Sequence, residues 1–588
     1  MAERNETGFS GIHRYFADFM VSLSNNLSQD EKRYLWLASA LVSYFVEKGH
    51  ICIDLQGLAG TEHPIDEDDR FKSVRCPDLS LWLDALKKAD VVGGPQEKRP
   101  LILTDNGRLY LNRYWQYERS FIGGIIRKLN LSTDCIDEAS LDKILNRLFP
   151  NQHKKEEDMQ RKAAKNAATK NFLVISGGPG TGKTFTIVKI IALLLELSNN
   201  KLSIALAAPT GKAAQRLKAV IKDARDKIDC PDEIKRHIPE DVLTIHRLLG
   251  ASYRTRRFRF HEDNPLPYDV IIIDEASMID LPLMSKFLSA IPIKTRLILV
   301  GDKDQLSSVE PGAVFGDICE GAEDIDSSIV ILKKNYRFTE DSGIGILSEL
   351  VKQGRGKDAL NILKAGRYED IIWHHIPSPD ILPMVIEKSI TDRYSRYIKS
   401  TDVEEAFRYF DEFHVLCALR HGPYGVIAVN ELIEKDLEKK GLIKITGRWY
   451  RGKPVMITVN DYSLKLFNGD TGIVFPDRDN KDMLRVYFKT EDGGLRKVVP
   501  ARIGDYETAY SITVHKSQGS EFNDIIIILP DRSSEILTRE LIYTAITRAK
   551  RGIEIWGNEG VFIEAVEKRI ERQSGIRDAL FSIPRNQG

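Results

Sequence analysis

The glycine-rich stretch Gly177-Gly-Pro-Gly-Thr-Gly-Lys-Thr184 decides the fold of this chain. It fits the pattern G-x-x-x-x-G-K-[ST], in which backbone N–H groups and a helix N-terminus face phosphate oxygens. The β-branched run at 171–176 predicts a buried strand before the loop, and the apolar run at 185–196 predicts a helix after it. This order of strand, loop and helix predicts a nucleoside triphosphate site.

Each position of the loop has an expected role. Lys183 is expected to reach the β- and γ-phosphate oxygens, and the Thr184 hydroxyl is expected to bind Mg²⁺. The residues predicted to cradle the phosphates are Gly177, Gly178, Pro179, Gly180, Thr181, Gly182, Lys183 and Thr184.

The composition is that of an ordinary globular protein. At 588 residues the chain is long enough for about four domains of roughly 150 residues. Lys plus Arg and Asp plus Glu both total 85, so any nucleic-acid surface must be a local patch. The six cysteines form no C-x-x-C pair, which argues against a zinc module or a disulfide scaffold and favours the cytoplasm. We expect neither a secretory signal nor a membrane span.

Short buried runs alternate with helical patterns from residue 171 onward, which predicts a parallel sheet with helices on both faces. After the first strand these runs lie at 204–208, 270–273, 297–300 and 329–332. A second series without a glycine loop lies at 413–418, 455–458, 510–513, 525–529 and 553–556. Two such sheets predict an α/β protein with two motor lobes and nucleotide between them.

The remaining segments complete a predicted domain plan. Residues 1–150 carry helical patterns and a hairpin around Asn106-Gly107, so we expect a mainly helical N-terminal domain with its own core. The first lobe is predicted at 151–345, with a basic hairpin near 250–267. The second lobe is predicted at 346–588, with a small β insertion near 470–506.

Polar residues follow several predicted strands, at the edge where parallel sheets bind ligands. Asp274 and Glu275 close the strand at 270–273; Asp274 is expected to hold Mg²⁺, and Glu275 to orient and deprotonate the attacking water. Gln305, after the next strand, can touch the γ-phosphate and that water. Arg337 and Arg548 are candidate arginine fingers, which stabilise charge on the transferring phosphoryl group. Spacing alone leaves a solvated surface role open for both arginines.

Two segments of the first lobe present hydroxyl, amide and basic groups that can grip phosphates without reading sequence. They contain Pro209, Thr210 and Lys212, and Thr244 and His246. The run at 253–261 interleaves arginines with aromatic residues, which suits a hairpin that contacts a strand by charge and stacking. A solvated basic hairpin is the alternative.

Taken in order, these segments resemble the motifs of the superfamily 1 helicases and, within them, the RecD family, the α subunits of exodeoxyribonuclease V (RecBCD). The resemblance covers nearly the whole chain. The matching segments are 176–184, 208–214, 244–250, 274–282, 416–420, 467–470, 513–522 and 543–548. Residues 49–52 and 109–115 resemble the family's N-terminal domain, which contacts RecC.

The resemblance implies two RecA-like lobes and an ATP-dependent helicase that moves 5′→3′ on single-stranded DNA. It implies a heterotrimer with RecB-like and RecC-like subunits that acts on DNA ends in double-strand break repair and recombination, with the nuclease in the RecB-like partner. The roles it implies are adenine recognition for Gln160, γ-phosphate sensing for Gln305, finger roles for Arg337 and Arg548, nucleotide contact for Glu521, and DNA contact for Thr210, His246, Asn468, Thr513 and His515. Met159 and Val459 depart from the family, which has Trp and Arg at these positions.

Two other functions stay open. A standalone RecD-like helicase would carry helix-hairpin-helix repeats before the motor, and residues 1–150 do not show them. A regulatory scaffold subunit with a dispensable ATPase would be free to lose its catalytic residues, yet the chain retains Lys183, Asp274, Glu275, Gln305 and Arg548.

Overall fold

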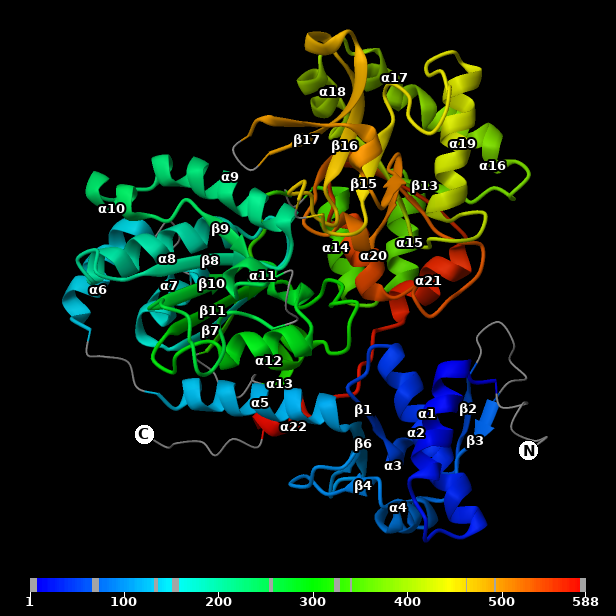
Figure 1. Ribbon diagram of the computed structural model, residues 1–588. Helices are drawn as coiled ribbons and strands as arrows, with labels where there is room; N and C mark the ends of the chain where they lie inside the picture. Colours follow the sequence, from blue (N-terminus) through cyan, green and yellow to red (C-terminus); the bar gives the residue numbers. More distant parts are fainter. Residues whose placement is uncertain are drawn as a thin grey trace.

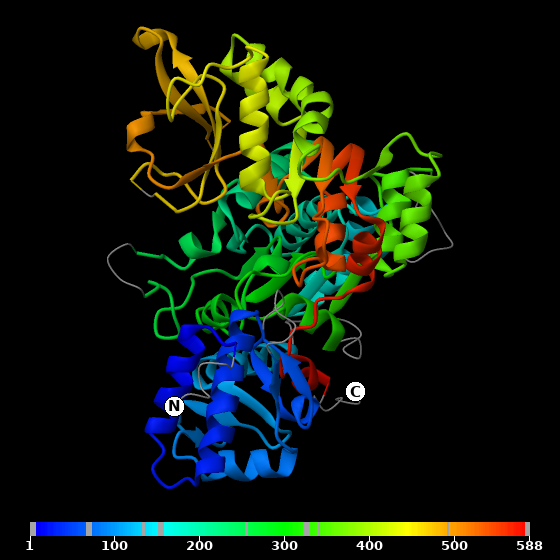
Figure 2. The same cartoon turned by 90° about the vertical axis from the view of Figure 1, so that its right-hand side faces the viewer.

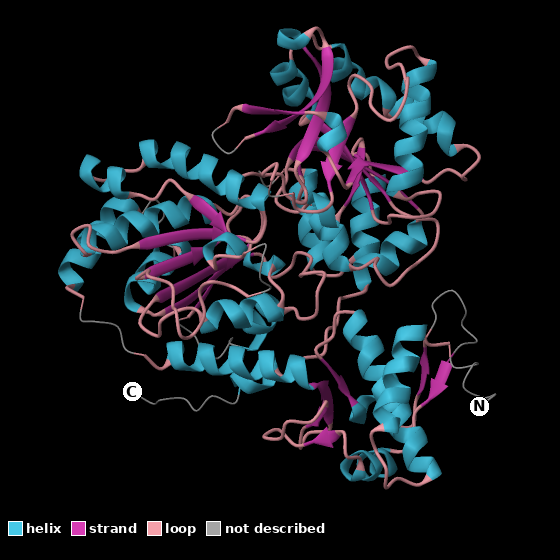
Figure 3. Ribbon diagram, in the orientation of Figure 1, coloured by secondary structure: helices cyan, strands magenta, loops and turns pink. Residues whose placement is uncertain are grey.

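The computed structural model describes residues 8–65, 73–131, 136–150, 158–252, 257–321, 328–338, 341–461, 463–490 and 493–581. In Figure 1 the first lobe lies at the left, the second lobe at the upper right and the N-terminal helices at the lower right. Figure 3 shows that helices and strands are combined in all of these parts. Parts of the predicted polar connection, basic hairpin and β insertion, at 151–157, 253–256 and 491–492, lie outside the described residues.

The first lobe is built on a six-stranded parallel sheet with the order β12-β7-β11-β10-β8-β9. Its strands are β7 Phe172–Gly177, β8 Ile204–Ala208, β9 Val242–Thr244, β10 Val270–Ile273, β11 Arg296–Gly301 and β12 Ile329–Leu332. The five strands predicted here are confirmed. The sequence does not predict β9, because three residues are too few to show a period.

Helices cover both faces of this sheet, because successive strand residues point to opposite sides and build two separate cores. One face carries α6 Glu138–Leu148, α7 Met159–Thr169, α8 Lys183–Leu197, α9 Gly211–Lys227 and α10 Asp232–His237. The other carries α5 Asn112–Leu129, α11 Ile245–Leu248, α12 Leu281–Ser289, α13 Val314–Gly321 and α22 Ile576–Phe581.

Three of these helices come from segments that the predicted domain plan assigns elsewhere. Helices α5 and α6 precede residue 150, yet Phe121 and Leu145 are fully buried in the two first-lobe cores. Helix α22 follows the second lobe, yet Ile576 is fully buried in a first-lobe core. All three would expose an apolar face without this sheet. The N-terminal part that packs around its own core therefore extends only to about residue 111.

The second lobe contains a five-stranded parallel sheet with the order β13-β22-β21-β14-β20. Its strands are β13 Ile371–His375, β14 Phe413–Cys417, β20 Ser511–Thr513, β21 Phe522–Ile528 and β22 Ala549–Gly557. One face carries α14 Gly343–Lys352, α15 Gly356–Lys364, α20 Arg539–Ile546 and α21 Glu559–Glu567. The other carries α16 Leu382–Ser389, α17 Thr391–Lys399, α18 Val403–Phe410 and α19 Val426–Lys439.

The prediction that 455–458 is a strand of this parallel sheet is wrong. The segment forms β15, the start of a separate antiparallel sheet with the order β18-β17-β16-β15-β19. Its strands are β15 Pro454–Ile457, β16 Thr471–Asp477, β17 Met483–Lys489, β18 Leu495–Val498 and β19 Tyr506–Thr508. Because β15 is buried between two neighbours, it lacks the alternation that marks an antiparallel strand. The β insertion therefore begins at Pro454, earlier than the predicted 470.

The N-terminal segment packs helices against a four-stranded sheet with the order β1-β6-β5-β4. Its elements are α1 Gly11–Ser22, α2 Gln29–Glu47, α3 Leu55–Leu58, α4 Leu79–Lys88, β1 Cys52–Asp54, β2 Glu62–Pro64, β3 Ser73–Arg75, β4 Val92–Gly93, β5 Leu101–Leu103 and β6 Arg108–Leu111. The predicted hairpin is confirmed, since β5 and β6 are antiparallel and Gly107 turns between them with φ of 76°. No described helix is long and apolar enough to cross a membrane.

A strap formed by residues 568–575 joins all three parts of the molecule. It leaves the second lobe at Lys568, whose carbonyl accepts the N–H of Arg539 over 2.8 Å. The carbonyl of Gln573 then accepts the N–H of Ile51 over 3.0 Å, and the N–H of Gly575 donates to Glu118 over 2.8 Å. Figure 2 shows that the insertion sheet and the N-terminal helices stand at opposite ends of the molecule, with the strap near the latter.

Candidate nucleotide and DNA site

The phosphate loop runs from the end of β7 to the start of α8. Gly180 and Gly182 take left-handed conformations, with φ of 83° and 80°, which favour glycine. A Cβ on Gly178 would lie 2.7 Å from the Tyr543 hydroxyl, so this position too must stay small. The Lys183 ammonium donates to the carbonyls of Gly177 and Gly178 over 2.6 and 3.1 Å. The lysine charge therefore lies beside the start of the phosphate loop.

Asp274 and Glu275 sit at the carboxyl end of β10, two strands from the loop. Burial, followed by the charge of Glu275, raises the pKa of Asp274 to about 6, while Lys183 works in the opposite direction. Glu275 has φ of 52°, a conformation that a residue with a side chain adopts at a cost of about 1–3 kcal/mol. A buried carboxylate near the lysine, together with Thr184 in the first turn of α8, is a donor set that suits Mg²⁺.

Gln305 is buried where the two lobes meet. Its amide donates to Asp302 over 3.0 Å, and its carbonyl oxygen accepts a guanidinium N–H of Arg548 over 3.1 Å. Arg548 is only 2% exposed and also donates to the carbonyl of Thr544. The hydroxyl of Tyr543 donates to Asp302 over 3.2 Å. Helix α20 of the second lobe and the residues after it thus contact the segment 302–305 of the first lobe.

Glu521, at the start of β21, forms ion pairs with basic side chains of both lobes. Its Oε1 accepts bonds from Arg337 and Arg216, each over 2.5 Å, and its Oε2 lies 3.5 Å from the Lys550 ammonium. Burial raises the pKa of Glu521, but the nearby guanidinium groups outweigh it and lower the pKa to about 2. The second terminal nitrogen of Arg337, Nη1, is buried without a hydrogen-bond partner among the described residues.

The segment 335–337 ties this arginine to the phosphate loop. The side-chain amide of Asn335 donates to the carbonyl of Pro179 over 3.1 Å, and the N–H of Tyr336 donates to Gly180 over 2.8 Å. Across the loop, the side chain of Gln160 donates to the carbonyl of Thr181 over 3.1 Å. Met159, beside it, packs partly buried against a first-lobe core.

The residues predicted to grip DNA lie along the edges of both lobes. Thr244 pairs in register with Ala208, so the segment that begins with Pro209 and the segment that begins with Thr244 leave the same sheet edge. Both threonines cap helices: Thr210 accepts the N–H of Ala213 over 3.2 Å, and Thr244 that of Arg247 over 3.3 Å. His246 is exposed, with its ring centroid 5.9 Å from that of Phe258.

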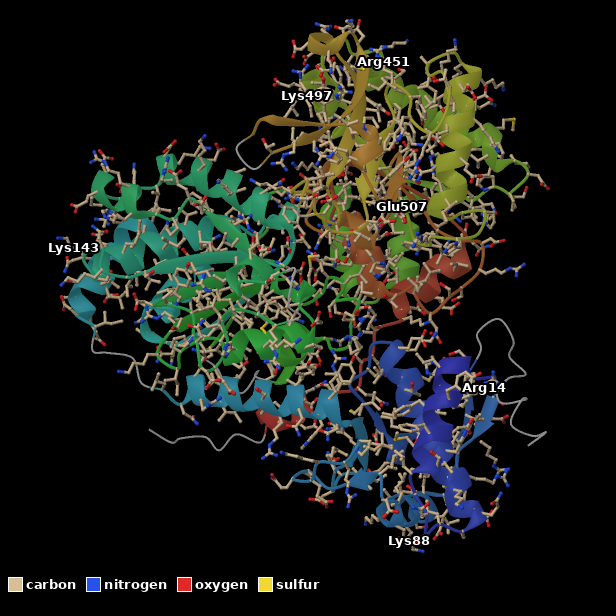
Figure 4. All side chains as sticks on the ribbon, viewed as in Figure 1. Arg14, Lys88, Lys143, Arg451, Lys497 and Glu507 are labelled. Atoms are coloured by element: carbon tan, nitrogen blue, oxygen red, sulfur yellow. The ribbon has the colours of Figure 1, made fainter. Side chains whose placement is uncertain are left out.

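The second lobe reaches this edge through two loops. A Cβ on Gly211 would lie 3.7 Å from the side chain of Phe467, which places exposed Asn468 beside the start of α9. Thr513 ends β20, and burial lowers the pKa of His515, two residues later. Burial likewise lowers the pKa of Lys212. Glu507, labelled in Figure 4 where the insertion sheet meets the second lobe, pairs with Lys516 over 3.3 Å.

Comparisons with known proteins cover most of the chain. Residues 6–110 match a family model described as "RecBCD enzyme subunit RecD, N-terminal domain". Residues 160–311 match an "AAA domain", and residues 508–553 a "UvrD-like helicase C-terminal domain". The RecD subunit of Mycolicibacterium smegmatis is 36% identical over 92% of this chain and 93% of its own length. This chain belongs to the RecD family. The RecD subunit of Haemophilus influenzae is 34% identical over 96% of both chains.

More distant relatives share less with this RecD-family chain. The "ATP-dependent RecD2 DNA helicase" of Deinococcus radiodurans is 29% identical over 81% of this chain and 59% of its own length. A solved Pif1 helicase from Bacteroides is 19% identical over 75% of this chain and 95% of its own length, with a TM-score of 0.38. The family and its motor domains make the chain an ATP-dependent DNA helicase of superfamily 1, with two RecA-like lobes.

Several residues of this site were not predicted as parts of it. Asn335 donates to the carbonyl of Pro179 in the phosphate loop, and Tyr543 donates to Asp302. Tyr336, 60% exposed, has its ring 3.8 Å from where a Cβ on Gly182 would lie. Asn335 and Tyr336 precede the candidate finger Arg337 in the sequence, and Tyr543 begins the family-like segment that ends at Arg548. Among the described residues, no group of three or more His, Cys, Asp or Glu side chains is arranged to hold a metal ion.

Proposed function

We propose that this chain is the 5′→3′ DNA translocase subunit of a RecBCD-type helicase–nuclease that acts on DNA ends in double-strand break repair and recombination. RecB-like and RecC-like chains are its partners in a heterotrimer. The observation that carries the motor assignment is the bond between Arg548 of the second lobe and Gln305 of the first, beside the phosphate loop. Because both lobes supply catalytic groups, hydrolysis can be coupled to their relative movement.

Each catalytic residue has a defined task in this proposal. Lys183 neutralises charge on the β- and γ-phosphates, and Glu275 orients the attacking water and takes its proton. Gln305 contacts the γ-phosphate, while Arg337 and Arg548 stabilise the charge that develops as the phosphoryl group transfers. Thr184 and Asp274 would hold Mg²⁺, which supplies further charge stabilisation when bound. Gln160 selects the adenine base, and Glu521 contacts the nucleotide.

DNA would lie along the edges that carry Thr210, His246, Asn468 and Thr513, with Pro209, Lys212, Thr244 and His515 lining the same path. Helix N-termini at Thr210 and Thr244 supply N–H groups that suit phosphate oxygens. Two separate grips, one on each lobe, would let the motor advance as the lobes close and open. Because these contacts are to the backbone, they read no base sequence.

Single-stranded DNA should stimulate ATP hydrolysis by the full-length chain without sequence preference. Log affinity should fall with log salt by about 0.7 for each phosphate contacted. Hydrolysis is measured by phosphate release with mixed-sequence oligonucleotides at several salt concentrations, and polarity by unwinding duplexes with 5′ or 3′ tails. Hydrolysis that ignores DNA, or unwinding only from 3′ tails, would refute the proposal.

Partner docking is best supported on α1. The face that packs inward carries His13, Ala17 and Met20, whereas exposed apolar side chains lie along another side of the helix. This α1 stripe consists of Ile12, Tyr15, Phe19 and Leu23, which are 70%, 77%, 57% and 43% exposed. Figure 4 places Arg14, also on α1, on the side of the molecule away from the first lobe. A contiguous exposed apolar surface of this kind is typical of protein interfaces. We propose that the RecC-like subunit covers it.

The double variant Tyr15→Asp, Phe19→Asp should lose assembly with the RecC-like subunit while keeping DNA-stimulated ATPase. Two aromatic anchors are replaced by charges, which should cost about 2 kcal/mol or more of binding energy. The matched control is Ile381→Asp, Met384→Asp, which alters two exposed apolar residues at the start of α16 in the second lobe. Co-purification and ATPase assays compare the variants. Undiminished assembly of the α1 variant would exclude the stripe as the docking surface.

A further inference from the structure

Arg216 lies on α9 between two carboxylates that belong to different lobes. Its Nη1 is 4.0 Å from Oε1 of Glu275 in the first lobe, and its Nη2 donates to Oε1 of Glu521 in the second over 2.5 Å. Both carboxylates are poorly exposed, at 14% and 11% of their side-chain surface. In such sites charge pairs are screened less than in water, so Arg216 influences where each carboxylate points.

The same helix connects this pair of carboxylates to the proposed DNA path. Helix α9 begins after its cap Thr210, next to Phe467 of the second lobe, and Arg216 follows less than two turns later. An α-helix of this length moves as a stiff element. A displacement of its N-terminus by a DNA strand therefore displaces Arg216 relative to Glu275.

Glu275 is a residue whose orientation needs outside support. Its backbone is in the left-handed region, with φ of 52°, and such a conformation persists only where the surroundings fix it. Its N–H donates to Asp274 over 2.9 Å, and Arg216 is the basic side chain paired with its carboxylate. On the other side, the oxygen of Glu521 that Arg216 holds also accepts the candidate finger Arg337 over 2.5 Å.

We propose that Arg216 is a positioning residue that makes ATP hydrolysis depend on DNA. The proposal rests on the proposed function and deepens it. Arg216 transmits the position of the DNA-facing end of α9 to the carboxylate of Glu275, which activates water. Through Glu521 it links the same movement to Arg337. Arg216 itself touches neither the phosphates nor the water.

The test compares full-length wild type with Arg216→Gln in steady-state ATPase assays, with and without saturating single-stranded DNA. DNA-stimulated kcat should fall by about 10- to 100-fold, and the ratio of stimulated to unstimulated kcat should fall toward one. KM for ATP and Kd for DNA should stay within about threefold of wild type, because Arg216 contacts neither ligand.

Two further variants separate this role from a structural one. Arg225→Gln removes an arginine from the same helix that pairs with Glu240 at the surface, and its stimulation ratio should match wild type. Arg216→Lys keeps the positive charge with a milder change in shape, and should recover part of the ratio. Thermal unfolding midpoints confirm that all three variants fold.

The outcomes are distinguishable. If wild type responds to DNA and a folded Arg216→Gln variant responds equally, this proposal is overturned while the proposed function stands. An equal loss of kcat with and without DNA, or a change confined to KM, overturns it as well. A wild-type chain that hydrolyses ATP without responding to DNA would overturn the proposed function, and this proposal with it.

Discussion

Replacing Lys183 with alanine should abolish ATP hydrolysis by this chain while leaving its fold intact, with a loss of turnover of about 10³-fold. The ammonium now donates to the carbonyls of Gly177 and Gly178 at the start of the loop. The ammonium is thus held at the loop that is expected to bind the β- and γ-phosphates. Phosphate release at saturating ATP and single-stranded DNA measures the loss.

Lys189→Ala is the matched control for this variant. Lys189 lies on the same helix, but its ammonium sits over the rings of Phe149 and Phe185, at 4.3 and 4.9 Å from their centroids. Its removal should leave turnover within a few-fold of wild type. Thermal unfolding of both variants tests the fold. Near-normal hydrolysis by a well-folded Lys183→Ala chain would be incompatible with the motor assignment.

The sequence predicts the parts of the site that depend on local order. The order of strand, glycine loop and helix predicts the position of Lys183. The end of a buried strand predicts the position of Asp274, because parallel sheets bind ligands at that edge. Both residues lie where these patterns place them. The roles of individual residues remain predictions until they are measured.

What sequence patterns miss depends on contacts between distant segments. Tyr543 reaches Asp302, and Arg216 reaches Glu521, only because two lobes built by different stretches of chain meet. The same limit explains why β15 is wrongly assigned to the parallel sheet, since a run buried on both sides has the same pattern in parallel and antiparallel sheets. It also explains α5, whose apolar face could belong to either neighbouring part of the chain.

Packing refines where the N-terminal segment can be removed. Deletion of 1–150 would strip α5 and α6 from the first-lobe sheet and expose both of its cores. A deletion that ends near residue 111 would leave these helices in place but still break the strap contact between Ile51 and Gln573. Point changes on the α1 stripe are therefore the cleaner way to separate docking from hydrolysis.

Arg548→Ala should lower kcat by about 10³-fold or more, with ATP binding weakened much less. Its guanidinium contacts Gln305 across the lobes, so it is placed to act on charge that develops during transfer, while Lys183 and the loop still bind the ground state. Steady-state kcat and KM are measured together with nucleotide Kd, which separates the loss of turnover from the loss of ATP binding. Arg548→Lys, which keeps the charge but not the forked donor, should also be strongly impaired.

The control for this variant lies three residues further along the chain. Arg551, in β22, is 65% exposed in its side chain and pairs with Asp524 at the surface, so Arg551→Ala should hydrolyse ATP normally. Because Arg548 is buried, its loss removes the donor to the carbonyl of Ser520 and one of two donors to that of Thr544, and stability must be measured in parallel. An unchanged kcat with a raised KM and Kd in a folded Arg548→Ala chain would show that this arginine binds nucleotide in the ground state and does not stabilise the transition state.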